Sequence, residues 1–387
     1  MNAAIDRYFK VTERGSTIGT EVRAGVVSFF AMAYIILLNP LILGTSEDSA
    51  GTTLGIPRVA AATALVAGVM TIAFGVIARY PFAMAAGLGM NTFVAVTMVS
   101  LNGLEWREAM GLVVIEGIII VMLAISGFRQ AVFDAIPASM KAAMGVGIGM
   151  FIALIGFVDG HFVTRVPDAA MTTVPVGLGV NGSISTWPAF VFVVGLILSG
   201  FFVIRQVRGG LFIGIVITTI IAMIIQALTG SEGWGMATPE IPSSLGGMPD
   251  LSIVGQVDPI GAFTKLGVVS TVLLIFTLLL TNFFDAMGTM NGLGKQANLV
   301  DENGNLPNMK TALVVEGVGA VAGGAGSVSS NTVFADSAAG IGDGARTGLA
   351  NVVTGVIFLL AMFLTPLYEI VPIEAAAPVL VLSLIHI

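Results

Sequence analysis

The stretch SSNTVFADSAAGIGDGARTG, from Ser329 to Gly348, places one acid, Asp336, among small residues between two long apolar runs. TALVVEGVGAVAGGAG precedes it and LANVVTGVIFLLAMFL follows it. If the flanking runs cross a membrane, Asp336 lies within a crossing, where an ionisable side chain costs roughly 3 kcal/mol and indicates a functional site by default. What the stretch does therefore depends on whether this chain spans a membrane.

The composition predicts a polytopic all-α membrane protein. Of 387 residues, 56% are hydrophobic and 10% are charged, against roughly 25% charged in a soluble domain. The runs Ala24–Leu43, Val59–Ala78 and Leu266–Phe284 reach or approach the length of about 20 residues that crosses a bilayer as a helix. A β-barrel would instead have short alternating segments. With no cysteine and two histidines, neither a disulfide framework nor a structural metal site is expected.

Apolar segments predict twelve crossings, of which the third and tenth are short and rich in glycine. They lie near 22–43, 59–78, 82–101, 109–128, 140–158, 188–204, 210–228, 264–288, 311–325, 329–345, 347–366 and 368–381. With a cytoplasmic N-terminus, four of the 16 Lys and Arg residues fall outside (Arg58, Arg107, Arg165 and Lys265), which leaves twelve inside. This asymmetry follows the positive-inside rule only if both short segments cross completely.

Two short matches indicate that the halves of the chain are related. VVS occurs at Val26–Ser28 and Val268–Ser270, and TALV at Thr63–Val66 and Thr311–Val314. The separation covers seven crossings, an odd number, so the repeats would be inverted. Paired, glycine-interrupted segments in inverted repeats predict a transporter site near the bilayer midplane.

The end of the chain predicts a truncated gene. Only five crossings of the second repeat are present, and PVLVLSLIHI stops inside an apolar run. The last six residues, LSLIHI, can be back-translated as CTGTCTCTTATACACATC, a sequencing-adapter end, so we expect residues 382–387 to be an artefact and His386 to have no role. About twelve of fourteen spans would then be present.

The first broken segment, PFAMAAGLGMNTFVAVTM (Pro81–Met98), combines a stretch without side-chain bulk with a strong polar group. Residues 85–89 are Ala or Gly except for Leu88, and Asn91 follows them. An extended piece before a half-helix leaves amide donors free for a polar ligand. The alternative is that small residues serve close helix packing, which is common in membranes.

The second broken segment is the opening stretch. A polar strip of Ser329, Ser330, Asn331 and Thr332 precedes Asp336, which lies where a short half-helix would begin. Asp336 could cap that helix, contact a ligand, or do both. We expect Asp343 and Arg346 to form a solvated or structural pair.

The third element is LLLTNFFDAMGTMNGLGKQ (Leu278–Gln296). Asn282 and Asp285 are three apart and share a helix face, with Phe283 and Phe284 between them. An acid, an amide and aromatic rings suit a flat heterocycle, which stacks and hydrogen-bonds through its edge. Alternatively, the phenylalanines face lipid and the acid is hydrated.

Two further acids lie within apolar segments. Glu316 lies in VVEGVG and Glu116 in VVIEGIII. Either acid could pair with a polar partner or serve a proton path.

Together, GLGMNTF, NFFDAMGT and SSNTVFADSAAGIGDGARTGL resemble the nucleobase–cation symporter-2 superfamily, in particular its adenine/guanine/hypoxanthine permease branch. The resemblance runs from about Glu21 to the end and implies two inverted repeats of seven spans, with a purine bound between short strands of spans three and ten, beside span eight. It divides the chain into a cytoplasmic N-terminal segment (1–20), core spans one to four (21–130), gate spans five to seven (131–230), an extracytoplasmic loop (231–262), core spans eight to eleven (263–366), the start of gate span twelve (367–381) and the six terminal residues (382–387).

The resemblance also implies roles for individual residues. Asn91 matches the family's span-three asparagine, and Asp285 the second acid of the pattern Asp-x-x-Asp-x-x-Gly-Thr. Asn282 stands where that pattern has its first acid, and Asp336 where the family usually has Glu; both departures leave the preferred base open. The expected substrate-binding residues are Asn91, Asn282, Phe284, Asp285, Asn331, Thr332 and Asp336, and the expected proton-coupling residues are Asp285 and Asp336.

The predicted function is import of purine nucleobases by a secondary transporter, through alternating access and proton symport. The proton would be the coupling ion, with no other cofactor and no nucleic-acid partner, and the family resemblance allows a homodimer through the gate. The expected location is the inner (plasma) membrane, multi-pass, with a cytoplasmic N-terminus.

Other functions make different demands on the sequence. Transport of uracil or xanthine, or of an anion by a related fold, remains an alternative, although an anion site would favour cationic or amide-lined walls over Asp285 and Asp336. A channel would have a continuous polar stripe. An enzyme would need a nucleophile–base set or a metal cluster, and His161 falls in a predicted outside loop.

Overall fold

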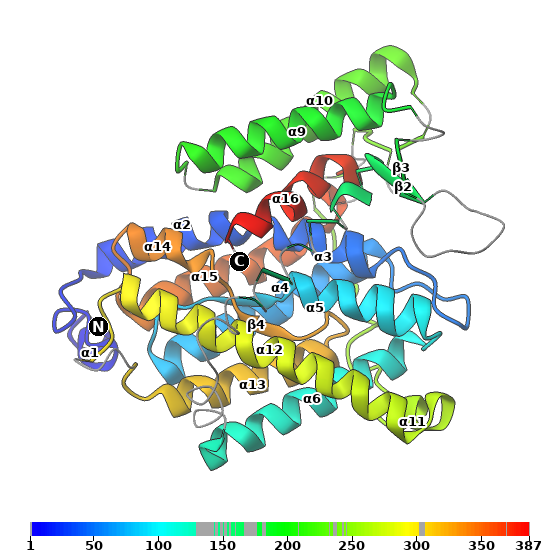
Figure 1. Ribbon diagram of the computed structural model, residues 1–387. Coiled ribbons are helices and arrows are strands. Elements are labelled where there is room, and N and C mark those ends of the chain that lie inside the picture. Colours follow the sequence, from blue (N-terminus) through cyan, green and yellow to red (C-terminus); the bar gives the residue numbers. More distant parts are fainter. Residues whose placement is uncertain are drawn as a thin grey trace.

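The computed structural model describes residues 2–128, 183–207, 209–231, 246–301, 306–368 and 370–386, with shorter stretches between 143 and 179 and between 233 and 244 (Figure 1). The described part is mainly helical, as predicted. Among the described residues, six helical segments are long and apolar enough to cross a membrane: Ile18–Leu43, Ile56–Ala78, Trp106–Ser126, Trp187–Ile204, Gly210–Thr229 and Val268–Gln296. The span predicted at 140–158 falls mostly outside the described residues.

Most helices begin and end within a few residues of the predicted crossings. In the first half they are α1 (Asn2–Phe9), α2 (Ile18–Met32), α3 (Ile35–Leu43), α4 (Ile56–Ala73), η1 (Phe74–Ala78), α6 (Trp106–Ser126), α9 (Trp187–Ile204) and α10 (Gly210–Thr229). In the second half they are α11 (Gly261–Leu266), α12 (Val268–Gln296), α13 (Met309–Ala325), α15 (Gly348–Ala361), η3 (Met362–Leu367) and α16 (Ile373–His386). A short hairpin, β2 (Val163–Arg165) with β3 (Val176–Leu178), precedes α9.

Start signals in the sequence explain several of these boundaries. The hydroxyls of Thr17 and Thr186 accept hydrogen bonds from backbone amides in the first turns of α2 and α9. Glu105 and Glu108 form a reciprocal capping box at the start of α6. The span predicted at 22–43 is interrupted: α2 ends at Met32 and α3 begins at Ile35, so Tyr34 lies at a break inside the apolar run.

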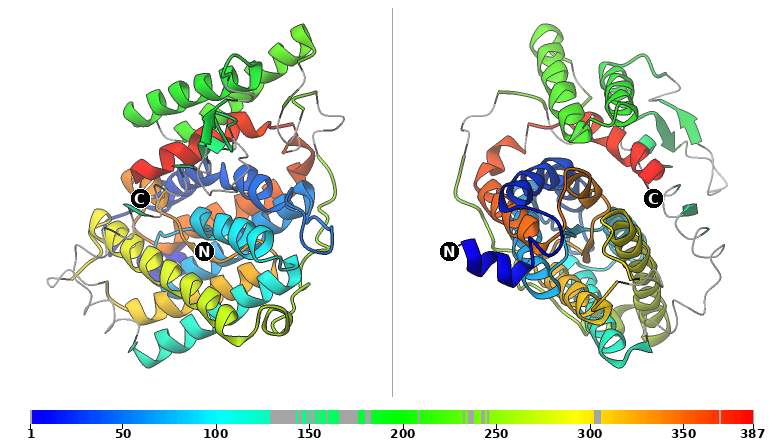
Figure 2. Two further views of the ribbon diagram at one scale, coloured as in Figure 1. Left: turned by 45° about the vertical axis from the view of Figure 1, so that its right-hand side comes forward. Right: turned by 90° about the vertical axis from the view of Figure 1, so that its left-hand side faces the viewer.

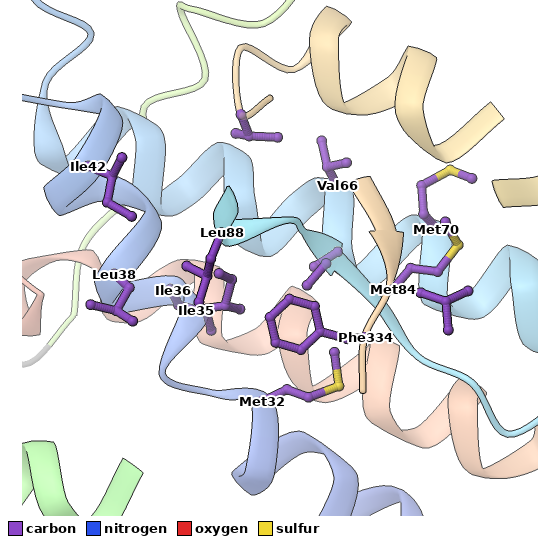
Figure 3. Packing of buried hydrophobic residues seen from close by; sticks show 14 of the residues in the cluster. Met32, Ile35, Ile36, Leu38, Ile42, Val66, Met70, Met84, Leu88 and Phe334 are labelled. Atoms are coloured by element: carbon purple, nitrogen blue, oxygen red, sulfur yellow. The ribbon is translucent and has the colours of Figure 1, made fainter. Parts of the chain in front are cut away.

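The two glycine-rich segments fold as a strand followed by a helix, as predicted. The first holds β1 (Met84–Ala86), α5 (Leu88–Thr92) and η2 (Phe93–Leu101), and the second holds β4 (Asn331–Val333) and α14 (Ser337–Gly342). The strands pair antiparallel, with Ala86 opposite Asn331. Around them, Met84, Leu88 and Phe334 pack with apolar side chains of α2, α3 and α4 (Figure 3). Two segments far apart in the chain thus meet in the core through backbone hydrogen bonds.

The helix packing is consistent with inverted repeats. The second span of each half packs on the fourth span of the other half: α4 packs on α15, and α13 packs on α6. Each strand packs on the second span of its own half, β1 on α4 and β4 on α13. Small residues allow both helix pairs to approach closely: a Cβ at Gly355 would lie 2.5 Å from the Gly68 oxygen, and one at Gly117 would lie 2.6 Å from the Val321 nitrogen.

Replacing Gly117 by Ala is expected to destabilise the protein by about 1–3 kcal/mol, because the added methyl group meets the backbone of α13 and the two helices must separate. The matched control is Gly200→Ala in α9, where the nearest heavy atom to the new Cβ is 3.9 Å away. Alanine is the better helix former, so this control should be neutral or stabilised. Thermal unfolding of the purified proteins measures both effects, and equal melting temperatures would contradict the predicted close packing.

Helices α9, α10 and α16 form a separate group (Figures 1 and 2). They pack on one another and meet the remaining helices along α2 and α3. In Figure 1 this group lies above the body that contains β4.

The loops gather at the two ends of the body as the predicted topology requires. At one end Arg14 donates hydrogen bonds to the backbone oxygens of Arg79 and Arg346. At the other end Lys265 contacts Ser49 and Glu108. Each set consists of segments that were predicted to share a side, which requires both broken segments to pass through the body.

Candidate functional site

A cavity of about 1050 Å³ lies between the body and the separate helix group. Its walls come from α12, from Ala335–Gly342 around α14, from Ala31 of α2, and from the end of α9 through the start of α10. Three of the predicted substrate-binding residues line it: Phe284, Asp285 and Asp336. The cavity therefore brings together acids from spans eight and ten with an aromatic ring.

Asp336 occupies the residue before α14, where the half-helix was predicted to begin. Its side chain does not cap the helix, so the capping interpretation was wrong. Asp336 Oδ2 instead accepts a hydrogen bond of 2.9 Å from the hydroxyl of Tyr34. The Phe334 ring lies 6.1 Å from the Tyr34 ring, between centroids. Tyr34, which lies between α2 and α3, thus holds the Asp336 carboxylate through this hydrogen bond.

Asn282 and Asp285 come from the same helix but lie in different surroundings. Asp285 lines the cavity, whereas Asn282 is completely buried. Asn282 Nδ2 donates to Glu116 Oε1 at 2.9 Å and to Ser330 Oγ at 3.1 Å, and Ser330 Oγ donates to Glu116 Oε2 at 3.3 Å. These contacts join α12, α6 and the residue before β4 into one polar cluster, which we call the Glu116 cluster (Glu116, Asn282 and Ser330).

Thr332 makes a related contact on the same strand. Its hydroxyl donates to Glu316 Oε1 at 3.4 Å, and both side chains are buried. Ser330 and Thr332 are two residues apart and so project to one side of the extended segment. The carboxyl groups of Glu116 on α6 and Glu316 on α13 therefore accept hydrogen bonds from hydroxyls of the second broken segment. Glu116 and Glu316 pair with polar groups, one of the two roles considered for each.

Asn91 and Asn331 are completely buried in the two broken segments. Neither the amide nitrogen nor the amide oxygen of either side chain has a hydrogen-bond partner among the described residues. A buried polar group without a partner costs roughly 1–3 kcal/mol. Asn331 lies on β4 opposite Ala86, Asn91 lies on α5, and neither lines the cavity, so their role in substrate binding stays a prediction.

The expected pair of Asp343 and Arg346 was wrong. Asp343 Oδ2 accepts from Arg23 Nε at 2.6 Å, at the start of the chain's first long helix. Arg346 donates to the backbone oxygens of Ile341 and Ala345. Both arginine contacts fix the end of α14.

Tyr34 is a site residue that the sequence patterns did not identify, as are the cavity-lining residues Gln206, Thr289 and Gln296. One signal was available: a tyrosine within an apolar run needs a hydrogen-bond partner for its hydroxyl once it is buried. The described residues include no group of three His, Asp or Glu side chains that could hold a metal ion. What the cavity offers a ligand is an aromatic face, hydrogen-bond acceptors and two acids.

Comparison with known proteins agrees with this architecture. The model of the permease family (Xan_ur_permease) matches residues 19–387. The adenine permease AdeQ of Escherichia coli is 34% identical over 98% of this chain and 79% of its own length. The guanine/hypoxanthine permease PbuG of Bacillus subtilis is 34% identical over 97% of this chain and 81% of its own.

A solved structure shares the fold at low sequence identity. The transmembrane domain of the cyanobacterial bicarbonate transporter BicA aligns with a TM-score of 0.67 and 15% identity, over 95% of this chain and 87% of that one. The fold class predicted from the sequence, a polytopic transporter of two inverted seven-span repeats, is confirmed. The chain belongs to the permease family, whose members are membrane transporters and not enzymes.

Proposed function

We propose that this protein imports purine nucleobases across the membrane. The observation that carries the proposal is the cavity shared by Phe284, Asp285 and Asp336, in a chain 34% identical to relatives named as adenine and guanine/hypoxanthine permeases. A purine ring presents N–H donors at its edge and an apolar face. Carboxylates accept those donors, and a phenylalanine ring packs against the face.

The charge of the cavity argues against an anion as substrate. Two acids line it, and none of the described lining residues is Lys, Arg or His. Structural neighbours include a bicarbonate transporter, but at 15% identity this likeness concerns the fold. An anion would have to leave water for a wall that already contains carboxylates, which raises its free energy in the site.

Transport would proceed by alternating access coupled to protons. The cavity separates a core (α2–α6 and α12–α15) from a gate that includes α9, α10 and α16, and movement of one against the other would expose it to each side in turn. Asp285 and Asp336 are the candidate proton carriers, since protonation removes the desolvation cost of a buried charge during that movement. The cavity borders Gln206 and Gln296, whose flanking segments carry the inside cations of the predicted topology, so this arrangement would face the cytoplasm.

Uptake assays in a host without its own nucleobase transporters test the proposal. Labelled adenine, guanine and hypoxanthine should enter saturably, an excess of unlabelled purine should compete, and a protonophore should prevent accumulation. Uracil and sulfate serve as competitors from other substrate classes, and xanthine as a purine other than the three expected substrates. Stronger competition by sulfate or uracil than by any purine would reject the proposed substrate, and accumulation that survives the protonophore would reject proton coupling.

A further inference from the structure

Tyr34 contacts the cavity acid Asp336 without lining the cavity itself. Its side chain lies at the break between α2 and α3, is 3% exposed, and does not line the cavity. Its hydroxyl donates to Asp336 Oδ2 at 2.9 Å. The phenol therefore contacts the acid and has no direct access to a ligand.

We propose that Tyr34 is a positioning residue, whose hydroxyl fixes the Asp336 carboxylate in the orientation that receives the substrate. This inference rests on the proposed function, because it assigns Tyr34 a task at the same site. The sequence patterns predict no role for Tyr34. Tyr34 lies in span one, outside the three elements expected to bind the substrate.

The local backbone supports this assignment. Tyr34 lies where α2 ends and α3 begins, and its hydroxyl reaches from there to the residue before α14. The Phe334 ring packs beside the phenol and restricts its movement. Hydrogen bonds to charged groups are worth roughly twice as much as those between neutral groups, so losing the hydroxyl should weaken the orientation of the carboxylate.

The contact also bears on why an aspartate occupies this position. The short side chain of Asp336 has one rotatable bond fewer than glutamate, and the Tyr34 hydroxyl holds one of its two oxygens. The other oxygen is then presented in a restricted set of directions. A carboxylate held in this way loses less conformational entropy when the substrate binds.

Tyr34→Phe removes one oxygen atom and is the direct test. We expect the KM for purine uptake to rise about tenfold, the change that loss of one hydrogen bond to a charged group produces, with maximal uptake per folded molecule changed less than twofold. The matched control is Tyr368→Phe, because the Tyr368 hydroxyl is also buried and donates to the Ala361 oxygen at 2.7 Å, away from the cavity residues. Its KM should stay within twofold of the wild type.

Each outcome decides between the proposal and a structural role. Uptake is normalised to the folded protein that elutes as a single peak after detergent extraction. A KM for Tyr34→Phe equal to that of Tyr368→Phe would overturn the positioning role, and so would loss of folded protein in Tyr34→Phe alone, because Tyr34 would then serve folding. If the wild-type protein transports no purine, the proposed function fails first; if it does and Tyr34→Phe behaves as wild type, this inference alone fails.

Discussion

Replacing Asp336 by Asn is expected to reduce concentrative purine uptake to the background of cells without the transporter. Asn has nearly the same size, and its Oδ1 can still accept the hydrogen bond from Tyr34. It cannot take up a proton or carry a negative charge. The substitution therefore changes the chemistry of the cavity wall while leaving its shape, and the ratio of labelled hypoxanthine inside and outside energised cells measures the effect.

The control for this substitution is Asp250→Asn. Asp250 is exposed in the segment before α11, and its Oδ1 accepts from the Ser252 amide, which an asparagine oxygen can also do. This variant should accumulate hypoxanthine as the wild type does. Normal accumulation by Asp336→Asn would refute the role of Asp336 as proton carrier. Substrate exchange without accumulation would show that the acid serves coupling and that the binding site survives.

The sequence predicts the architecture well because the bilayer imposes strong local requirements. A crossing helix needs a long apolar run, and a broken crossing needs residues that leave the helix, which the Ala and Gly residues at 85–89 and the polar strip at 329–332 provide. The pairing of the two broken segments follows from the inverted repeat. The break at Tyr34 has no such signal, since AMAYII contains good membrane-helix residues and tertiary contacts with Phe334 and Asp336 accompany it.

Side-chain partners within the site could not be predicted, because they depend on contacts between distant segments. Asn282 and Asp285 share a helix face by spacing, yet Asn282 meets Glu116, 166 residues earlier in the chain. Asp343 and Arg346 are neighbours in sequence, yet Asp343 pairs with Arg23, 320 residues away. Local spacing decides which face a residue occupies, and helix packing decides what that face contacts.

Replacing Glu116 by Leu is expected to destabilise the protein by about 3 kcal/mol or more. The carboxylate accepts hydrogen bonds from Asn282 Nδ2 and from Ser330 Oγ, and all three side chains are completely buried. Leucine fills the space but accepts neither bond, and each buried polar group left unsatisfied costs roughly 1–3 kcal/mol. Because the Glu116 cluster joins α6 and α12 to the residue before β4, the loss should reach the strand crossing and appear as a lower melting temperature in detergent.

The comparison with Glu116→Gln separates packing from charge. The glutamine oxygen can accept from Asn282, and its amide can donate to the Ser330 oxygen. Only the Ser330 hydroxyl then loses its acceptor, so the variant should melt well above the Leu variant. Equal melting temperatures for the Leu and Gln variants would show that these contacts do not stabilise the fold. If the Gln variant is stable and takes up purine normally, Glu116 serves structure alone. If it is stable but no longer accumulates purine, Glu116 lies on the proton path together with Asp285 and Asp336.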